Sequence, residues 1–244
     1  MGKRPTIFCL ILTLLGLSLL PVKGQAKDVT VGIPHNPPLI FYKTKGSPQG
    51  ILPAVALKAL EKMGHRPIFR PLPFGRMYKW LHSGKIDMAL SVLATPQRQK
   101  KAYYSDPIII EKLNLAVSQQ ANMSLNISKI AKRDICGIIG FSYPTLTFTP
   151  QNMVLEKDYP SCLSSLTKGQ VDGVIIGSIT GPHIIQTAWL ADQIMLLPDA
   201  IGSVKIGAAL SHKAFSPQDL IQFNQHVNEI LQSPYGQRLL APYQ

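Results

Sequence analysis

The 244-residue chain contains little cysteine and little acid. Three cysteines are too few for a disulfide-stapled scaffold or for a zinc module built from several cysteines. Only 13 Asp and Glu accompany 25 Lys and Arg, which gives a net charge of +12. Charged residues make up 16% of the chain and hydrophobic residues 45%, a composition that excludes a disordered protein and indicates a globular one.

Sequence signatures of common enzyme classes are also absent. The chain has no Gly-x-Ser-x-Gly elbow, no His-Glu-x-x-His, no phosphate-binding glycine loop and no Gly-x-Gly-x-x-Gly. Its six histidines stand apart from one another, without metal-ligand spacing, so we expect no metal and no cofactor. The acids form no obvious general acid/base pair, although a pair from distant parts of the chain stays open. His35 is the histidine to watch, because it leaves the first predicted strand at the expected edge of a cleft.

Long hydrophobic runs are missing after residue 20. The one run, residues 7–20, follows Lys3 and Arg4 and precedes small residues at Gly24 and Ala26. This layout predicts a secretory signal peptide over residues 1–26, cleaved after Ala26. A bilayer-spanning helix needs about 20 apolar residues, so the run is short for a permanent anchor, which remains the alternative. The protein is therefore expected in the periplasm.

The positive charge is spread along the chain. Residues 1–26 hold three basic and no acidic residues, which leaves a net charge of +9 for residues 27–244. Apart from residues 98–101 and 132–133, the basic residues are scattered, and no arginine-rich arm or stacking motif accompanies them. We therefore expect a solvated basic surface and no nucleic-acid partner. A preference for anionic ligands is the weaker alternative.

Hydrophobic periodicity predicts two short α/β series. Strands are expected at residues 28–33, 67–70 and 86–92, and helices at 51–63 and 75–83. The rhythm restarts with strands at 135–139, 154–156 and 171–176 and a helix at 159–168. Extended segments at 108–117 and 203–210 and a final helix at 217–232, with Ser216 as its N-cap, complete the pattern. The order predicts parallel strands flanked by helices, in two lobes that meet at a ligand-binding cleft.

One motif occurs in both series. The pattern Leu-x-x-Gly-x-[Ile/Val]-Asp spans residues 81–87 and again residues 166–172. In each copy a helix is followed by a glycine stop and an aspartate that opens an apolar strand. The repetition predicts two lobes of similar construction.

The ordered motifs of residues 27–244 resemble those of the bacterial extracellular solute-binding proteins of family 3, the amino-acid-binding type of ABC importers. The resemblance rests on the Pro-Pro turn after the first strand, both copies of the Leu-x-x-Gly motif, Thr-Pro-Gln-Arg at 95–98, Tyr-Ser-Asp-Pro at 104–107 and Gly-Ile-Ile-Gly-Phe-Ser at 137–142. It implies the two-lobed, type II periplasmic-binding-protein fold, with mixed sheets flanked by helices and two crossover hinge strands. Lobe 1 would comprise residues 27–115 and 207–244, and lobe 2 residues 116–206. The lobes would close by hinge bending around a small solute.

The same resemblance assigns roles in the cleft. Arg98 would bind a ligand carboxylate through its guanidinium fork, and its alternative is a surface arginine at a helix start. Phe74 would form an aromatic wall or belong to ordinary packing, and Arg76 would offer a second anion contact. Ser142 would stand at the start of a lobe 2 helix, as a carboxylate contact or as a plain N-cap.

Three positions depart from the amino-acid-binding pattern. Gly177 stands where amino-acid binders carry the aspartate that pairs with the ligand's α-ammonium, and Ser178 lies beside it. Asn36 and Leu39 occupy places where those proteins usually have aromatic residues. We therefore expect an anionic or polar solute, carboxylate-bearing, in preference to a zwitterionic amino acid. Another acid, or Ser178 with backbone carbonyls, could replace the missing aspartate.

Three functions are compatible with the sequence. The leading hypothesis is a monomeric, non-enzymatic binding protein that serves an ABC permease. A sensory module for a membrane receptor is the second, and a cyclohexadienyl-dehydratase-like enzyme is the third, for which no convincing glutamate is found. Cys136 and Cys162 either form a disulfide, as expected in an oxidising compartment, or are two buried free thiols.

Overall fold

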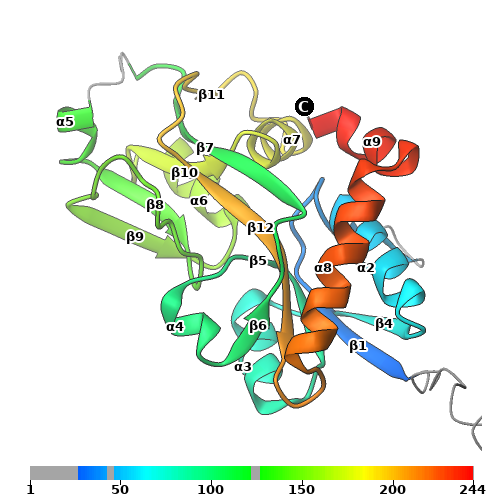
Figure 1. The fold of residues 1–244 in the computed structure, drawn as a ribbon. Helices are drawn as coiled ribbons and strands as arrows, with labels where there is room; N and C mark the ends of the chain where they lie inside the picture. Colours follow the sequence, from blue (N-terminus) through cyan, green and yellow to red (C-terminus); the bar gives the residue numbers. More distant parts are fainter. Residues whose placement is uncertain (1–26, 43–46, 122–126, 244) are drawn as a thin grey trace, which may run out of the picture.

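The computed structural model describes residues 27–42, 47–121 and 127–243, and these residues form two α/β lobes (Figure 1). The predicted signal peptide, residues 1–26, lies outside the described residues. No helix in the described ranges is long and apolar enough to cross a membrane.

Lobe 1 holds the first part of the chain and its end. Its strands are β1 (Asp28–Ile33), β2 (Phe41–Tyr42), β3 (Pro48–Gln49), β4 (Arg66–Pro71), β5 (Met88–Val92) and β6 (Ala102–Tyr104). Its helices are α2 (Ile51–Lys62), α3 (Phe74–Ser83), α4 (Pro96–Gln99), α8 (Pro217–Gln232), α9 (Pro234–Leu240) and the 3₁₀ turn η1 (Ala241–Tyr243).

Lobe 2 holds the middle of the chain. Its strands are β8 (Asp134–Ile138), β9 (Asn152–Glu156), β10 (Gly173–Gly177) and β11 (Ile194–Leu196), and its helices are α5 (Ile127–Ile130), α6 (Tyr159–Thr167) and α7 (Thr180–Thr187). Two long strands, β7 (Ile109–Ser118) and β12 (Gly202–Ser211), pass between the lobes. The predicted lobe boundaries, 115/116 and 206/207, fall inside these two strands.

The strands form one continuous mixed path, β4-β1-β5-β12-β7-β10-β8-β9. Strand β1 pairs in parallel with β4 and β5, and β8 pairs in parallel with β9 and β10. Strands β7 and β12 are antiparallel to each other, with Leu113 opposite Gly202 and Ile109 opposite Ile206. In Figure 1 this antiparallel pair runs through the middle of the molecule. The predicted fold class, with two crossover strands and mixed sheets, is confirmed.

The core of lobe 1 is formed by the apolar residues that recur at strand and helix spacing in the sequence. Val29, Val31 and Ile33 of β1 are fully buried. On the final helix, Phe223 and Val227 are also fully buried, and α8 packs beside α2 (Figure 1). Ser216 caps α8 in a capping box with Asp219, as its sequence predicts.

The repeated Leu-x-x-Gly motif makes the same backbone connection in both lobes. In lobe 1, Asp87 N–H donates to the Thr30 carbonyl, and the Asp87 carboxylate accepts the Thr30 N–H at 2.8 Å. In lobe 2, Asp172 N–H donates to the Asp134 carbonyl, and the Asp172 carboxylate accepts the Asp134 N–H at 3.1 Å. Each aspartate therefore fastens its own strand to the neighbouring parallel strand.

A disulfide joins Cys136 of β8 to Cys162 of α6, with 5.8 Å between the two Cα atoms. This separation lies in the usual range for a bridge. Both residues are fully buried, and both belong to lobe 2. The bridge therefore ties a helix to the sheet of one lobe without linking the two lobes.

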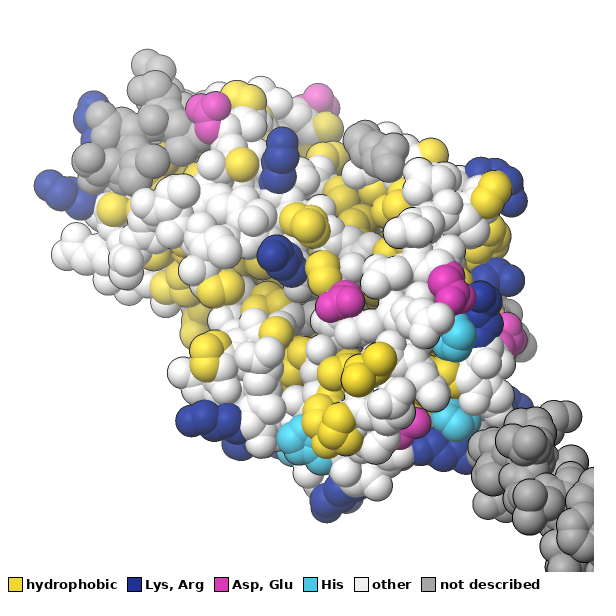
Figure 2. Space-filling view, in the orientation of Figure 1, with side chains coloured by type: hydrophobic (Ala, Val, Ile, Leu, Met, Phe, Trp, Pro, Cys, Tyr) yellow, Lys and Arg dark blue, Asp and Glu magenta, His cyan; other side chains and the backbone are white. Residues whose placement is uncertain are grey.

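Basic side chains are spread over the face of the molecule that Figure 2 shows. Figure 2 shows Lys and Arg as separate groups across this face rather than as one patch. On this face the distribution agrees with the scattered basic residues of the sequence.

Candidate functional site

A small cavity lies between the two lobes and against the crossover strands. Its volume is about 40 Å³, and both lobes and both crossover strands contribute to its walls. The lining residues are Asn36, Phe74, Ser91, Val92, Leu93 and Arg98 from lobe 1, Phe141, Ser142, Tyr143 and Tyr159 from lobe 2, and Glu111, Leu113, Val204 and Ile206 from the crossover strands. It sits where the predicted two-lobe arrangement expects a ligand.

The cavity adjoins a larger groove of about 500 Å³. Four residues line both spaces, namely Asn36, Phe74, Phe141 and Tyr159. His35 also lines the groove, in agreement with its expected place at the cleft edge. The two spaces together form one cleft, and the groove alone has the size of a small-molecule site.

Arg98 reaches from lobe 1 to lobe 2. It lies on the short helix α4, where the Thr95 side chain caps its N–H. The guanidinium donates to the Leu93 carbonyl at 3.3 Å and to the Gly140 carbonyl at 2.7 Å. Its carbon Cζ lies 4.5 Å from the centre of the Tyr78 ring. The predicted carboxylate anchor therefore faces the cleft, and its fork already holds two oxygen acceptors.

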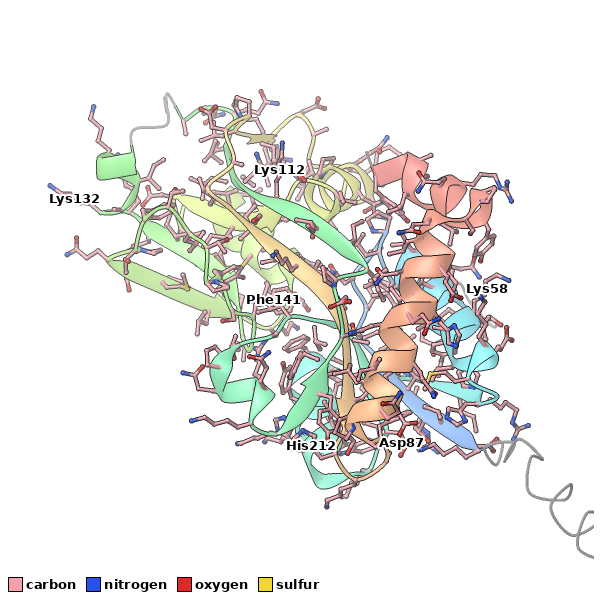
Figure 3. The ribbon with its side chains drawn as sticks, in the orientation of Figure 1. Lys58, Asp87, Lys112, Lys132, Phe141 and His212 are labelled. Atoms are coloured by element: carbon pink, nitrogen blue, oxygen red, sulfur yellow. A yellow bond between two sulfur atoms is a disulfide. The ribbon has the colours of Figure 1, made fainter. Side chains whose placement is uncertain are left out.

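Aromatic rings form a wall around this guanidinium. The Phe74 ring centre lies 5.2 Å from that of Tyr78 and 5.1 Å from that of Phe141, which belongs to lobe 2. Figure 3 labels Phe141 in the region where the two lobes meet. Phe74 therefore lines the cavity and also packs against neighbouring rings.

Two tyrosine hydroxyls are joined behind this wall. Tyr78 and Tyr104 share a hydrogen bond of 2.8 Å between their hydroxyl oxygens. Burial raises the pKa of both phenols, and the bond to Tyr104 raises the pKa of Tyr78 further. Both rings therefore stay neutral beside Arg98.

Glu111 brings a carboxylate into the cavity from the crossover strand β7. Only 4% of Glu111 is exposed. Its Oε1 accepts the backbone N–H groups of Ile179 at 3.1 Å and Thr180 at 2.8 Å, at the start of α7. Burial raises the pKa of the Glu111 carboxyl above its ordinary value, although these backbone hydrogen bonds favour the charged form.

The carboxylate of Glu111 fills the space above Gly177. A Cβ atom added to Gly177 would lie 2.0 Å from Cδ and from Oε1 of Glu111. The carboxylate of Glu111, a residue distant in sequence, therefore occupies the place of the missing side chain, which agrees with the open alternative of another acid at this position. Glu111 is a glutamate that the sequence did not single out, and it lines the cavity.

Ser142 lines the cavity, but it does not start a helix. Residues 141–151 contain no helix, and Ser142 lies in an irregular segment. The segment pairs with residues at the start of β12 instead, because the Thr147 N–H donates to the Ile201 carbonyl and the Thr145 hydroxyl accepts the Ser203 N–H at 2.8 Å. Tyr143 instead turns inward, and its hydroxyl accepts the Ile138 N–H at 3.0 Å. Ser142 therefore does not place a ligand anion at a helix N-terminus, contrary to the prediction from the sequence.

Two other predicted residues are not brought to the cavity. Arg76 is exposed on α3 and does not line the cavity or the groove. The Ser178 N–H donates to the Lys112 carbonyl, and Ser178 does not line either space. Asn36 does reach the cleft, where it is 7% exposed, and its Oδ1 is buried without a hydrogen-bond partner among the described residues.

The backbone of Ser91 is a feature that the sequence did not indicate. Ser91 lies inside β5 with φ of 60°, in the left-handed region, and lines the cavity. A non-glycine residue in this conformation costs of order 1–3 kcal/mol and is common at ligand sites. Across residues 27–42, 47–121 and 127–243, no group of three or more His, Cys, Asp and Glu could hold a metal ion.

Comparisons with known proteins agree with this fold. The family model of bacterial extracellular solute-binding proteins, family 3, matches residues 29–237. A search of curated proteins finds no match.

Three solved structures are similar in fold. The first is a histidine kinase sensor domain with similarity to periplasmic binding proteins, with TM-score 0.76 and 17% identity, covering 88% of this chain and 94% of that chain. The second is the substrate-binding protein of an amino acid ABC transporter, with TM-score 0.74 and 18% identity, covering 87% and 97%. The third is an ABC uptake transporter substrate-binding protein from Streptococcus pneumoniae with bound histidine, with TM-score 0.73 and 14% identity, covering 87% and 90%.

Proposed function

Because the chain belongs to the bacterial extracellular solute-binding proteins, family 3, we propose that it captures a small carboxylate-bearing solute between its lobes in the periplasm. It would deliver this solute, as a monomer, to an ABC permease. The observation that carries the proposal is Arg98, whose guanidinium faces the cleft and donates to carbonyl oxygens of both lobes.

The chemistry of Arg98 favours a carboxylate over a neutral ligand. Its fork now donates to the carbonyl oxygens of Leu93 and Gly140. A carboxylate would replace these neutral acceptors by charged ones in the same geometry, which roughly doubles the strength of each hydrogen bond. The expected preference for an anion over a zwitterion rested on the missing carboxylate at position 177. Because the Glu111 carboxylate lies at that position, this argument against a zwitterion no longer holds.

The test is binding by the protein that comprises residues 27–244. A thermal-shift screen against amino acids and organic acids identifies ligands, since a ligand at 100 times its dissociation constant adds about 2.7 kcal/mol of stability. Calorimetry then compares variants. We expect Arg98→Ala to weaken binding of the best acid by about 100-fold and Arg98→Lys to restore it only in part. Arg76→Ala, on the exposed face of α3, is the matched control and should bind normally.

Export is tested separately. We expect protein isolated from the periplasm of the producing cells to begin at Lys27, as measured by intact mass. A mass that still includes Met1 would contradict cleavage after Ala26.

Sensing is a second candidate, favoured by the similarity to a histidine kinase sensor domain. The ligand-bound protein would then dock on a membrane receptor instead of feeding a transporter. Genes for a permease and an ATPase beside this one would favour import, and their absence would favour sensing.

Catalysis is the third candidate, and Glu111 now makes it testable. If the protein binds its ligand without turnover, every solute found in the screen should be recovered unchanged after prolonged incubation, as measured by NMR. Loss of a carboxylate-bearing solute, abolished by Glu111→Gln, would replace binding by an enzyme function.

A further inference from the structure

The groove beside the cavity has a mostly apolar floor that both lobes contribute to. Its buried lining residues are Pro34, Asn36, Ile138, Tyr159 and Ile184. Apart from Asn36 and the hydroxyl of Tyr159, these side chains are apolar. Asn36 also lines the cavity, so it lies at the inner end of the groove. The part of a ligand that extends along the groove therefore rests on apolar side chains, which favour an apolar body.

The charges of the groove do not favour a cationic ligand. Asp158 is the one acidic residue among its described lining residues, and Lys157 beside it offsets that charge. The Oδ1 atom of Asp158 accepts the Ser161 N–H at 2.9 Å and the Ser161 hydroxyl at 2.6 Å, so this carboxylate caps α6. A basic group of a ligand would lose hydration in the groove and gain no net attraction there.

The groove is much larger than the cavity that holds Arg98. Its volume is about 500 Å³, against about 40 Å³ for the cavity. Arg98 lines the cavity and not the groove. A carboxylate bound to Arg98 therefore leaves the rest of the solute to extend into the groove, which has the size of a site for a ligand with a ring system.

Two aromatic rings stand where the cavity meets the groove. Phe74 of lobe 1 and Phe141 of lobe 2 line both spaces, and their ring centres are 5.1 Å apart with the planes inclined at 58° (Figure 3 labels Phe141). A solute that passes from the groove to Arg98 separates these rings and removes their contact. A planar ring on the solute would replace that contact by packing against both phenylalanines. A saturated body of the same size would restore only the apolar area.

We propose that the solute is an aromatic carboxylic acid, with its ring between Phe74 and Phe141 and over the apolar floor of the groove. This inference rests on the proposed function, in which Arg98 holds the carboxylate. The substrate class is a carboxylate joined by a short linker to an apolar ring that carries no basic group. The ring of the solute connects the two lobes in place of the direct ring contact.

The first experiment is calorimetry on residues 27–244 with a series of carboxylates. Benzoate, phenylacetate, 3-phenylpropanoate and 4-phenylbutanoate are compared with acetate, lactate and succinate. We expect the best phenyl acid to bind at least 30-fold more tightly than the short polar acids, because each buried methylene contributes about fourfold in affinity. The cyclohexyl analogue of that acid has the same shape without the aromatic ring, and it should bind about 2- to 10-fold more weakly than the phenyl acid.

The second experiment fills the groove. Ala188 is exposed and lines the groove, so Ala188→Trp adds a ring there without disturbing the core. It should weaken the best phenyl acid at least 10-fold. Ala191→Trp is the matched control, because Ala191 is exposed in the same segment and lines neither space. Phe141→Leu keeps an apolar side chain and should remove the preference for the phenyl acid over its cyclohexyl analogue. Circular dichroism would show that each variant is folded.

The outcomes separate this inference from the proposed function. Short polar acids that bind as tightly as the phenyl acids would overturn the inference and leave the proposed function standing. Equal affinity for the phenyl acid and its cyclohexyl analogue would also overturn it, as would a folded Ala188→Trp variant that binds like Ala191→Trp. Binding of no carboxylate at all would overturn the proposed function and the inference with it.

Discussion

At the scale of the residue, the cleft contains one buried acid, Glu111, on the inward face of strand β7. In β7, Ile109, Glu111 and Leu113 are buried, whereas Ile110 and Lys112 between them are exposed, so Glu111 points inward between two apolar neighbours. The strand sequence therefore carried a signal, because an acid on a buried face of a strand needs a partner. What the sequence could not show is the partner, since Glu111 and Gly177 meet only when β7 pairs with β10.

We predict that Glu111 makes the ligand-free protein less stable as the pH rises. The folded-state pKa of Glu111 is raised above its ordinary value of 4.5, so the folded state binds this proton more tightly than the unfolded state. Its contribution is fully present below about pH 4.5 and is lost as the pH rises through the folded-state pKa. The other charged or titratable side chains on this cavity are Arg98, Tyr143 and Tyr159, and burial raises the pKa of both tyrosines.

Urea unfolding at several pH values tests this contribution. The stability of Glu111→Gln minus that of the unsubstituted protein should increase between about pH 4 and pH 8. Asp158→Asn is a control of opposite sign that acts at lower pH, because its stability difference should be nearly constant above about pH 4 and change only below it. Burial of Asp158 opposes its ionisation, but hydrogen bonds from Ser161 outweigh burial and lower the pKa of Asp158. A Glu111→Gln difference that is flat with pH would contradict the prediction.

At the scale of the element, the aspartates of the repeated motif are structural. Asp87 and Asp172 each hold a neighbouring parallel strand through a backbone N–H and a carboxylate. Figure 3 labels Asp87, which lies in lobe 1 and does not line the cleft. The motif therefore explains why each lobe folds with its strands in register, and it assigns neither aspartate to the ligand.

We predict that Asp87→Ala destabilises the protein without changing ligand affinity. The substitution leaves the Thr30 N–H without its acceptor, which costs about 1–3 kcal/mol. Asp87→Asn keeps an acceptor oxygen and should cost less. Asp192→Ala is the matched control, because Asp192 is exposed and its carboxylate makes no hydrogen bond or ion pair with the described residues. Equal stability of Asp87→Ala and Asp192→Ala in urea unfolding would show that the strand contact contributes nothing.

The disulfide within lobe 2 gives the next prediction. Cys136 and Cys162 are 26 residues apart, so removing the bridge should cost about 3–4 kcal/mol in the chain-entropy account. The double substitution Cys136→Ala and Cys162→Ala should lower the free energy of unfolding by that amount and leave ligand binding intact, because neither residue lines the cleft. Thiol counting on denatured, unreduced protein of residues 27–244 should find no free thiol. Two free thiols would contradict the bridge.

The sequence predicted most elements because their apolar patterns are regular and their ends are marked. Helix α8 is observed at the predicted residues, 217–232, since its apolar face, its N-cap serine and its first-turn proline all agree. Helix α7 was not predicted, because Gly181 and Pro182 near its start resemble a loop. The predicted helix at Ser142 is absent because its segment pairs with residues at the start of β12, a contact between distant parts of the chain that the sequence could not show.

At the scale of the whole molecule, the two lobes already touch across the cleft. Arg98 of lobe 1 donates to the Gly140 carbonyl of lobe 2, and the Phe74 and Phe141 rings meet beside this bond. The cavity inside these contacts is only about 40 Å³, well below the usual size of a ligand site. A ligand that reaches Arg98 and Glu111 must therefore part these contacts, and bending of β7 and β12 is the motion that the two crossover strands allow.

We predict that Phe141→Ala shifts the ligand-free protein towards a more open arrangement of the lobes. The substitution removes the ring of lobe 2 that packs on Phe74, and an aromatic pair contributes about 0.5–1.5 kcal/mol beyond the area it buries. This loss is enough to change a two-state population several-fold, because about 1.4 kcal/mol is a factor of ten. Spin labels at the exposed positions Gln97 in lobe 1 and Leu155 in lobe 2 would report the distance between the lobes. We expect a longer and broader distance distribution in the variant, whereas a control pair within lobe 1, at Gln97 and Lys85, should be unchanged. Identical interlobe distributions in the two proteins would mean that this ring contact does not hold the lobes together.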